Sequence, residues 1–204
     1  MACCTTVVEL VRRPGQTIRG YFDGRRRGLT SPLTFVALSV ALTLLLTSLM
    51  PDFKAAHEAQ LEGLAGYRPL YSAKQFDMFV AIEHAATEGK ALLLALLLIP
   101  TTLTMRFMFR KHRLNLAETG AVVCYLYGVS TFVMLPLAVA IALAGQAKLE
   151  STLAMVSMVG FLLHLAFGVY GRSFSTAWRA VWAGVLGLLL MQLGLILAPF
   201  VLAR

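Results

Sequence analysis

The sequence predicts an all-α membrane protein, a bundle of five transmembrane helices. Of the 204 residues, 58% are hydrophobic and 14% are charged, whereas soluble globular chains have about 45–50% and about 25% respectively. The apolar residues gather in runs of about 18 or more, the length that crosses a hydrocarbon core about 30 Å thick. Because no strand-like alternation or internal repeat accompanies these runs, helices alone are expected.

The first 31 residues form a basic and only patchily apolar segment, which we expect to lie along the cytoplasmic membrane surface. Pro14 and Gly15 interrupt its apolar stretch. We expect no signal peptide, because the first long apolar run begins about thirty residues into the chain and no small-residue cleavage site follows it. Ser31 and Pro32 then supply a helix cap and a first helical residue.

A membrane domain is expected over residues 32–204, with a polar outer segment at 51–89. The five expected spans cover about 32–50, 90–109, 115–144, 151–171 and 180–202. Pro100 and Pro136 predict kinks in the second and third spans.

The outer segment is expected to hold two helices, near 52–62 and 72–88. Ser72 and Gln75 have the spacing of a capping box at the start of the second one. This helix is expected to lead directly into the second span.

The distribution of lysine and arginine predicts an N-inside, C-outside orientation of the membrane domain. In this orientation the inner segments carry twelve of the eighteen basic residues and the outer segments carry six, as the positive-inside rule requires. Anionic lipid headgroups are the expected partners of the basic N-terminal segment. Nucleic acid is not expected, because no aromatic residues interleave with the basic ones.

Small residues recur at helical spacing in the last three spans, a pattern typical of close contacts between membrane helices. The contacts are expected either within this chain or with another membrane protein or a second copy. The residues are Gly120, Cys124 and Gly128 in the third span, Gly160 and Gly168 in the fourth, and Gly184, Gly187 and Gly194 in the fifth.

Glu118 is the first polar residue that could carry chemistry, since a carboxylate within a span is expensive. It has a structural interpretation and a functional one. Asn115 lies three residues earlier, so the two can form a reciprocal helix cap, and Arg106 across the hairpin could form an ion pair with the carboxylate. In the functional interpretation, Glu118 is a proton or substrate site.

His164 is expected near the middle of the fourth span, where water is scarce. It either donates a hydrogen bond to a neighbouring carbonyl as a packing residue, or serves a proton relay helped by Tyr125, Tyr127 or Tyr170. Cys3 and Cys4 lack further partners for a metal, so no metal site and no cofactor are expected.

Two segments carry a resemblance to a known family. Residues 9–42, with an Arg-Pro-Gly element and a Ser-Pro pair, and residues 109–120, "FRKHRLNLAETG", resemble an uncharacterised bacterial multi-pass membrane family. Many members of that family begin with a four-cysteine, zinc-ribbon-like head, which is missing here apart from two cysteines. The arrangement of spans is also similar to that of Yip-type membrane proteins. The resemblance implies a multi-pass domain in a bacterial inner membrane, without an assigned reaction.

These observations predict an integral membrane subunit or scaffold that packs with partner membrane proteins or with itself and has no catalytic chemistry. The alternative is a component of a transporter or channel that uses Glu118, Arg106 and His164. A membrane enzyme is a third class, but no catalytic motif supports it. A stoichiometric partner favours the first function, and ion movement in liposomes favours the second.

Overall fold

The computed structural model describes residues 2–49, 68–69, 71–88, 90–112, 114–143 and 147–202. Within these ranges all regular elements are helical, which confirms the all-α class. In chain order they are α1 (Ala2–Arg12), α2 (Pro14–Phe22), α3 (Pro32–Leu49), α5 (Ala73–Glu88), α6 (Lys90–Met108), the short 3-10 helix η2 (Arg110–His112), α7 (Leu116–Leu143), α8 (Ala147–Tyr170) and α9 (Phe174–Leu202).

The helices α3, α6, α7, α8 and α9 correspond to the five expected spans. Two of these helices, α7 over Leu116–Leu137 and α9 over Phe174–Gly194, are long and apolar enough to cross a membrane, while Pro32–Leu45 and Val156–Tyr170 are shorter apolar stretches in the described part of the chain. The structure therefore supports membrane-spanning length in two helices, and the number five remains a prediction.

The fourth and fifth helices begin earlier than expected, at Ala147 and Phe174, so that Arg179 lies within α9 and not in a loop. The connection between them is short because its residues end one helix and start the next. Gly171 adopts a positive φ of 94°, the usual conformation after a helix C-terminus. Ser173 then accepts a hydrogen bond from the backbone N–H of Thr176, which caps α9.

The outer segment agrees with the sequence in its second part. The helix α5 begins after Ser72, whose Oγ accepts from the N–H of Gln75, and the Gln75 Oε1 in turn accepts from the N–H of Ser72. This is the predicted capping box. The first expected helix, at 52–62, falls outside the described residues.

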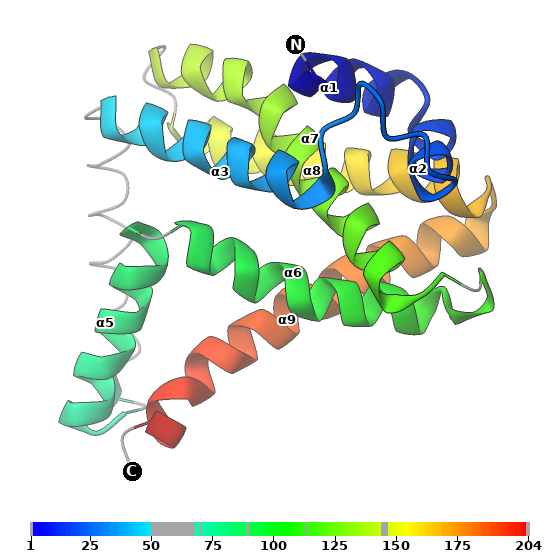
Figure 1. The fold of residues 1–204 in the computed structure, drawn as a ribbon. Coiled ribbons are helices and arrows are strands. Elements are labelled where there is room, and N and C mark those ends of the chain that lie inside the picture. Colours follow the sequence, from blue (N-terminus) through cyan, green and yellow to red (C-terminus); the bar gives the residue numbers. More distant parts are fainter. Residues whose placement is uncertain are drawn as a thin grey trace.

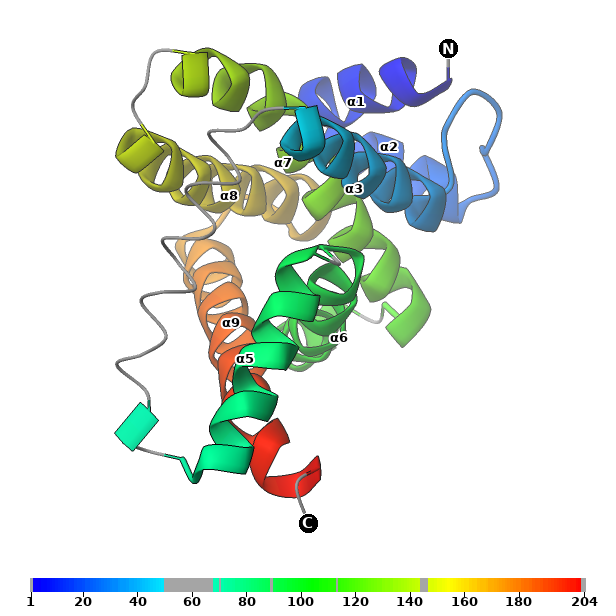
Figure 2. The same cartoon turned by 90° about the vertical axis from the view of Figure 1, so that its left-hand side faces the viewer.

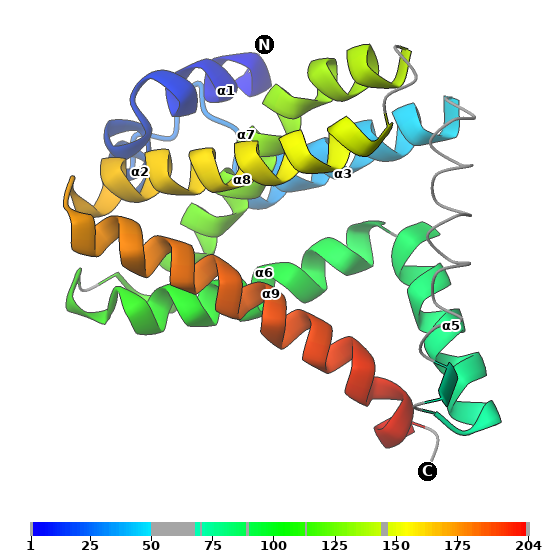
Figure 3. The same cartoon turned by 180° about the vertical axis from the view of Figure 1, so that it is seen from behind.

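The bundle has two groups of helices (Figures 1 and 2). On one side α3 packs against α7, and α7 packs against α8; on the other, α6 packs against α9, which also contacts α8. The helix α5 stands across one end of the bundle. At the opposite end lie α2, η2 and the connection from α8 to α9, at the right of Figure 1 and at the left of the rear view in Figure 3. We call this the basic end, because arginine-rich segments meet there.

Three glycines that the sequence singled out lie where helices approach closely. A Cβ on Gly128 would overlap the ring of Phe35, which brings α7 against α3. A Cβ on Gly187 would lie 2.7 Å from Oγ1 of Thr101, and one on Gly184 would lie 3.0 Å from a methyl group of Leu162. The absence of a side chain thus lets α9 approach both α6 and α8.

The remaining small residues differ in their surroundings. Cys124 is buried in α7, and a Cβ on Gly120 would make an ordinary contact of 3.7 Å with Thr102. Gly160 and Gly194 are exposed, and a Cβ on either would meet nothing within 4 Å. These two glycines make no close contact with the described part of this chain.

The N-terminal segment is folded onto the bundle, and its expected position along the membrane surface stays a prediction. Thr6 and Leu10 of α1 and Ile18 of α2 are almost fully buried. The hydroxyl of Tyr125 on α7 donates to the carbonyl of Thr30 at 2.8 Å, and the N–H of Thr30 donates to Oγ1 of Thr6 at 2.8 Å. The segment packs inward because buried apolar side chains and satisfied polar groups anchor it to α7.

Candidate functional site at the basic end

The N-terminal segment meets α8 at a backbone-to-backbone contact. Gly15 lies in the first turn of α2, and Gly168 lies in the last turn of α8. A Cβ on Gly168 would come within 2.8 Å of the Gly15 nitrogen and of a Pro14 ring carbon, and a Cβ on Gly15 would overlap the Gly168 carbonyl. Only two residues without side chains allow the helices to come this close.

Two side chains bond helix ends across this contact. The Nη2 of Arg19 on α2 donates to the carbonyls of Gly168 at 3.3 Å and Val169 at 2.9 Å, which are among the last carbonyls of α8 and have no partner within that helix. The cation also suits the negative end of the α8 dipole.

Arg19 bonds from α2 to the end of α8, whereas His164 bonds from α8 to the end of α1. Its Nε2 lies 2.9 Å from the carbonyl of Val11, in the last turn of α1. Because a carbonyl can only accept, Nε2 carries the proton in this bond. Together with Arg19, His164 ties the N-terminal helices to α8.

His164 lies in the last two turns of α8, on an exposed face beside the end of α1. Its expected depth in the membrane stays a prediction. Two of the three tyrosines expected to assist it bond other groups: Tyr125 donates to Thr30, and Tyr127 pairs with Thr101 at 3.4 Å. The structure thus places His164 in a helix-end contact.

Glu118 and Asn115 form a reciprocal cap at the start of α7. The N–H of Asn115 donates to a Glu118 carboxylate oxygen, and the N–H of Glu118 donates to Oδ1 of Asn115, both at 2.8 Å. This is the arrangement that the sequence spacing indicated. Among the residues that the structure describes, no ion pair joins Glu118 to Arg106, which is half-buried near the end of α6. The carboxylate reaches back to its own helix end instead.

The hairpin after α6 also packs on the end of α8. The rings of Phe109 and Tyr170 are stacked with centroids 4.0 Å apart, and His112 meets Tyr170 edge-on at 5.1 Å. The buried hydroxyl of Tyr170 has no hydrogen-bond partner in the described part of the chain. The ring contacts of Tyr170 join the hairpin to α8.

A groove of about 250 Å³ opens between the first two helices and α8. We call it the arginine groove. Its lining includes Arg12, Arg13, Gln16, His164, Phe167 and Arg172. No acidic side chain is among the described residues that line it. The groove is thus strongly cationic.

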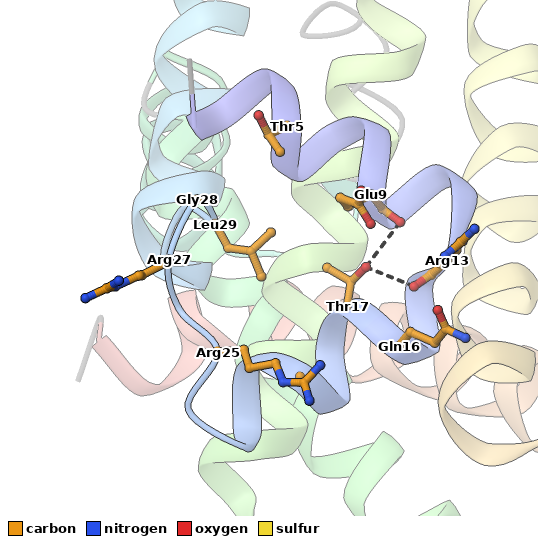
Figure 4. A pocket seen from close by; sticks show the side chains of 10 residues that line it. Thr5, Glu9, Arg13, Gln16, Thr17, Arg25, Arg27, Gly28 and Leu29 are labelled. Atoms are coloured by element: carbon orange, nitrogen blue, oxygen red, sulfur yellow. Dashed lines mark hydrogen bonds between the residues drawn. The ribbon is translucent and has the colours of Figure 1, made fainter.

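A second pocket, of about 320 Å³, shares Arg13 and Gln16 with the arginine groove but has a different character (Figure 4). Glu9 lines it beside Arg13, and Thr17 uses its hydroxyl to donate to the carbonyls of Glu9 and Arg13. Arg27 points away from the other labelled side chains (Figure 4). The arginines of this second pocket do not point toward one another, and the carboxylate of Glu9 offsets part of their charge.

Metal ligation finds no geometric basis in the described residues, where no group of three or more His, Cys, Asp or Glu side chains comes together. Burial raises the pKa of the Cys3 thiol, and neighbouring Cys4 adds to the increase.

Sequence reasoning missed the residues that build this end of the molecule, namely Gly15, Arg19 and Arg172. Each lies in a basic or turn-rich segment, where arginines are explained by topology and a glycine by chain reversal. The sequence held two signals for the glycines. Gly168 is one of the two small residues noted in the fourth span, and Gly15 follows a proline at a helix start. Their pairing required the tertiary structure.

Fold and site together define an all-α protein whose N-terminal helices are docked on a cationic end of the bundle. A family described as "Protein of unknown function (DUF3667)" matches residues 4–44, which include most of α1, all of α2 and most of α3. This match supports the resemblance of the N-terminal segment to an uncharacterised family. No curated protein and no solved structure matches the chain, and nothing in these comparisons supports a similarity to Yip-type proteins or to a zinc-ribbon head.

Proposed function

We propose that the chain is an integral membrane protein with five spans, N-inside and C-outside, that works as a subunit or scaffold. In this role it packs with partner membrane proteins or with copies of itself and carries out no catalytic chemistry. The basic end faces the cytoplasm, because Lys and Arg next to spans are retained on that side.

The observation that carries this proposal is the use of Glu118 and His164. Both were the polar residues best placed to move protons, and both spend their hydrogen bonds on helix ends. A proton site needs a group that is free to exchange its partner, whereas these bonds hold α7 and α1 in position. The geometry therefore favours a structural role over transport.

The outer surface of α9 supports a role in packing. Its exposed side chains are large and apolar, and include Trp178, Trp182, Leu189, Leu190 and Leu193. Gly194 lies on this surface of α9, and Gly160 lies exposed on α8. A Cβ on either glycine would meet nothing within 4 Å in the described chain. In lipid, exposed small residues allow a second helix to approach closely.

The test is purification of the tagged chain in a mild detergent, with mass spectrometry of the proteins that co-elute. We expect a stoichiometric membrane partner or a defined oligomer. The double variant Gly160→Leu/Gly194→Leu should lose this assembly while keeping its own thermal stability, because the new side chains meet open space. Leu190→Ala, an exposed change on the same helix, is the matched control and should retain the assembly.

The contrary result is a monomer without partners. If that monomer moves protons in liposomes, and Glu118→Gln abolishes the movement, the chain is a transporter component and the scaffold proposal is wrong. If the double leucine variant assembles as the parent does, the two glycines do not form the interface.

A further inference from the structure

The arginine groove holds more positive charge than the fold itself requires. Arg12 ends α1, Arg13 lies between α1 and α2, and Arg172 comes from the connection after α8. All three are exposed, and among the described residues none forms an ion pair with a carboxylate. Three guanidinium groups around a volume of about 250 Å³ repel one another. The groove is therefore best occupied by an anion.

The three arginines of the groove differ from Arg19 in their hydrogen bonds. Arg19 donates to the carbonyls of Gly168 and Val169 and so has a structural partner. Arg12, Arg13 and Arg172 have no such bond to a helix end among the described residues, so that their planar donor groups remain available. Guanidinium groups match phosphate oxygens in bidentate geometry, which makes arginine the preferred residue for this anion.

The backbone of the site does not oppose an anion. The helix α2 starts at the groove without a side-chain cap on its first turn, so the positive end of its dipole adds to the field of the arginines. The negative end of α8 lies close by, but Arg19 bonds its last carbonyls. The positive charge of the groove comes mainly from its three arginines, and neither helix end neutralises it.

The remaining lining indicates where the anion comes from. Phe167, which is half-buried on α8, forms an apolar wall of the groove. His164 also lines it and faces the end of α1. If the basic end faces the cytoplasm, as the proposed function has it, the groove lies at the level of the inner-leaflet headgroups. A phospholipid can place its phosphate among arginines and its chains beside an aromatic ring.

We propose that the arginine groove binds a phosphate monoester, the group carried by the headgroup of phosphatidic acid and related anionic lipids. Arg12 and Arg172 bind the phosphate from opposite sides, and Arg13 completes its charge neutralisation. This inference rests on the proposed membrane role for the source of the phosphate. A lipid bound in this groove would hold α1 and α2 against α8, next to the contact between Gly15 and Gly168.

The test is calorimetric titration of the full chain in uncharged detergent with three probes: dioctanoyl phosphatidic acid, dioctanoyl phosphatidylcholine and inorganic phosphate. Phosphatidic acid should bind about tenfold or more tightly than phosphatidylcholine, because its headgroup is a net anion whereas the choline cation balances the phosphate of phosphatidylcholine. The double variant Arg12→Gln/Arg172→Gln should weaken phosphatidic acid binding about tenfold or more. Neither side chain bonds a helix end in the structure, so the variant should unfold at the same temperature as the parent.

The matched control is Arg27→Gln/Lys111→Gln, which removes the same charge from exposed positions outside the groove. It should change the affinity less than about threefold, because a general surface field is weak and screened by salt. Equal losses in both double variants, or the same affinity for both lipids, would overturn the proposal. Binding of inorganic phosphate with the same dependence on Arg12 and Arg172 supports the phosphate site with a soluble source.

Failure of this inference is distinguishable from failure of the proposed function. The titration uses the isolated chain and needs no protein partner, whereas the assembly test scores only co-eluting proteins. A chain that recruits a partner but binds no phosphate retains its scaffold role and loses the groove. A chain that binds phosphatidic acid without partners retains the groove and loses the scaffold role.

Discussion

Gly15 and Gly168 meet backbone to backbone, so that the first turn of α2 and the last turn of α8 share one contact with no side chain between them. Arg19 and His164 place their hydrogen bonds around this contact. The N-terminal segment is therefore held by shape and by bonds to helix ends, and both should be sensitive to single substitutions.

Gly168→Ala should detach the N-terminal helices or lower the stability of the protein by about 1–3 kcal/mol, the usual cost of adding atoms to a filled contact. Faster trypsin cleavage within residues 12–27 would report the detachment. Gly20→Ala is the control, because a Cβ there would lie 3.8 Å from the Arg25 side chain, an ordinary contact. Equal protease resistance of parent and Gly168→Ala would show that the close contact does not hold the segment.

Gly187→Leu should separate α9 from α6, because a Cβ at this position would already lie 2.7 Å from Thr101. The leucine would also strain the nearby hydrogen bond from Thr104 Oγ1 to the carbonyl of Ala183. Leu189→Ala, which changes a side chain that is 58% exposed, should be mild. Thermal unfolding in detergent compares the two. Similar unfolding temperatures for both variants would contradict the packing of α6 on α9.

Asn115→Ala should destabilise α7 by about 1 kcal/mol, since the N–H of Glu118 loses its acceptor. Glu118→Gln should cost less, because a glutamine amide oxygen can still accept from the N–H of Asn115. Chemical unfolding of both variants measures the difference. A larger loss of stability in Glu118→Gln than in Asn115→Ala would mean that the carboxylate charge has a partner other than the cap.

Some of these features could be predicted from the sequence because they depend on neighbouring residues. The caps at Ser72 and Asn115 and the approximate extents of the helices follow from local spacing and apolar length. The docking of α1 and α2 could not be predicted, because it depends on which faces of α7 and α8 are open to them. The partner of His164 could not be predicted for the same reason, since Val11 is 153 positions away in the chain. Local patterns determine helix ends, and tertiary packing determines which ends meet.

The proposed function depends most directly on which side of the membrane each end of the bundle faces, and cysteine labelling tests this orientation. Single cysteines at Asp77, exposed on α5, and at His112, exposed in η2, would be introduced into a chain with Cys3, Cys4 and Cys124 replaced. We expect an impermeant maleimide added to intact cells to label position 77, and to label position 112 only after the membrane is permeabilised. Labelling of position 112 in intact cells, or equal labelling of both positions, would contradict the proposed orientation and the cytoplasmic location of the basic end.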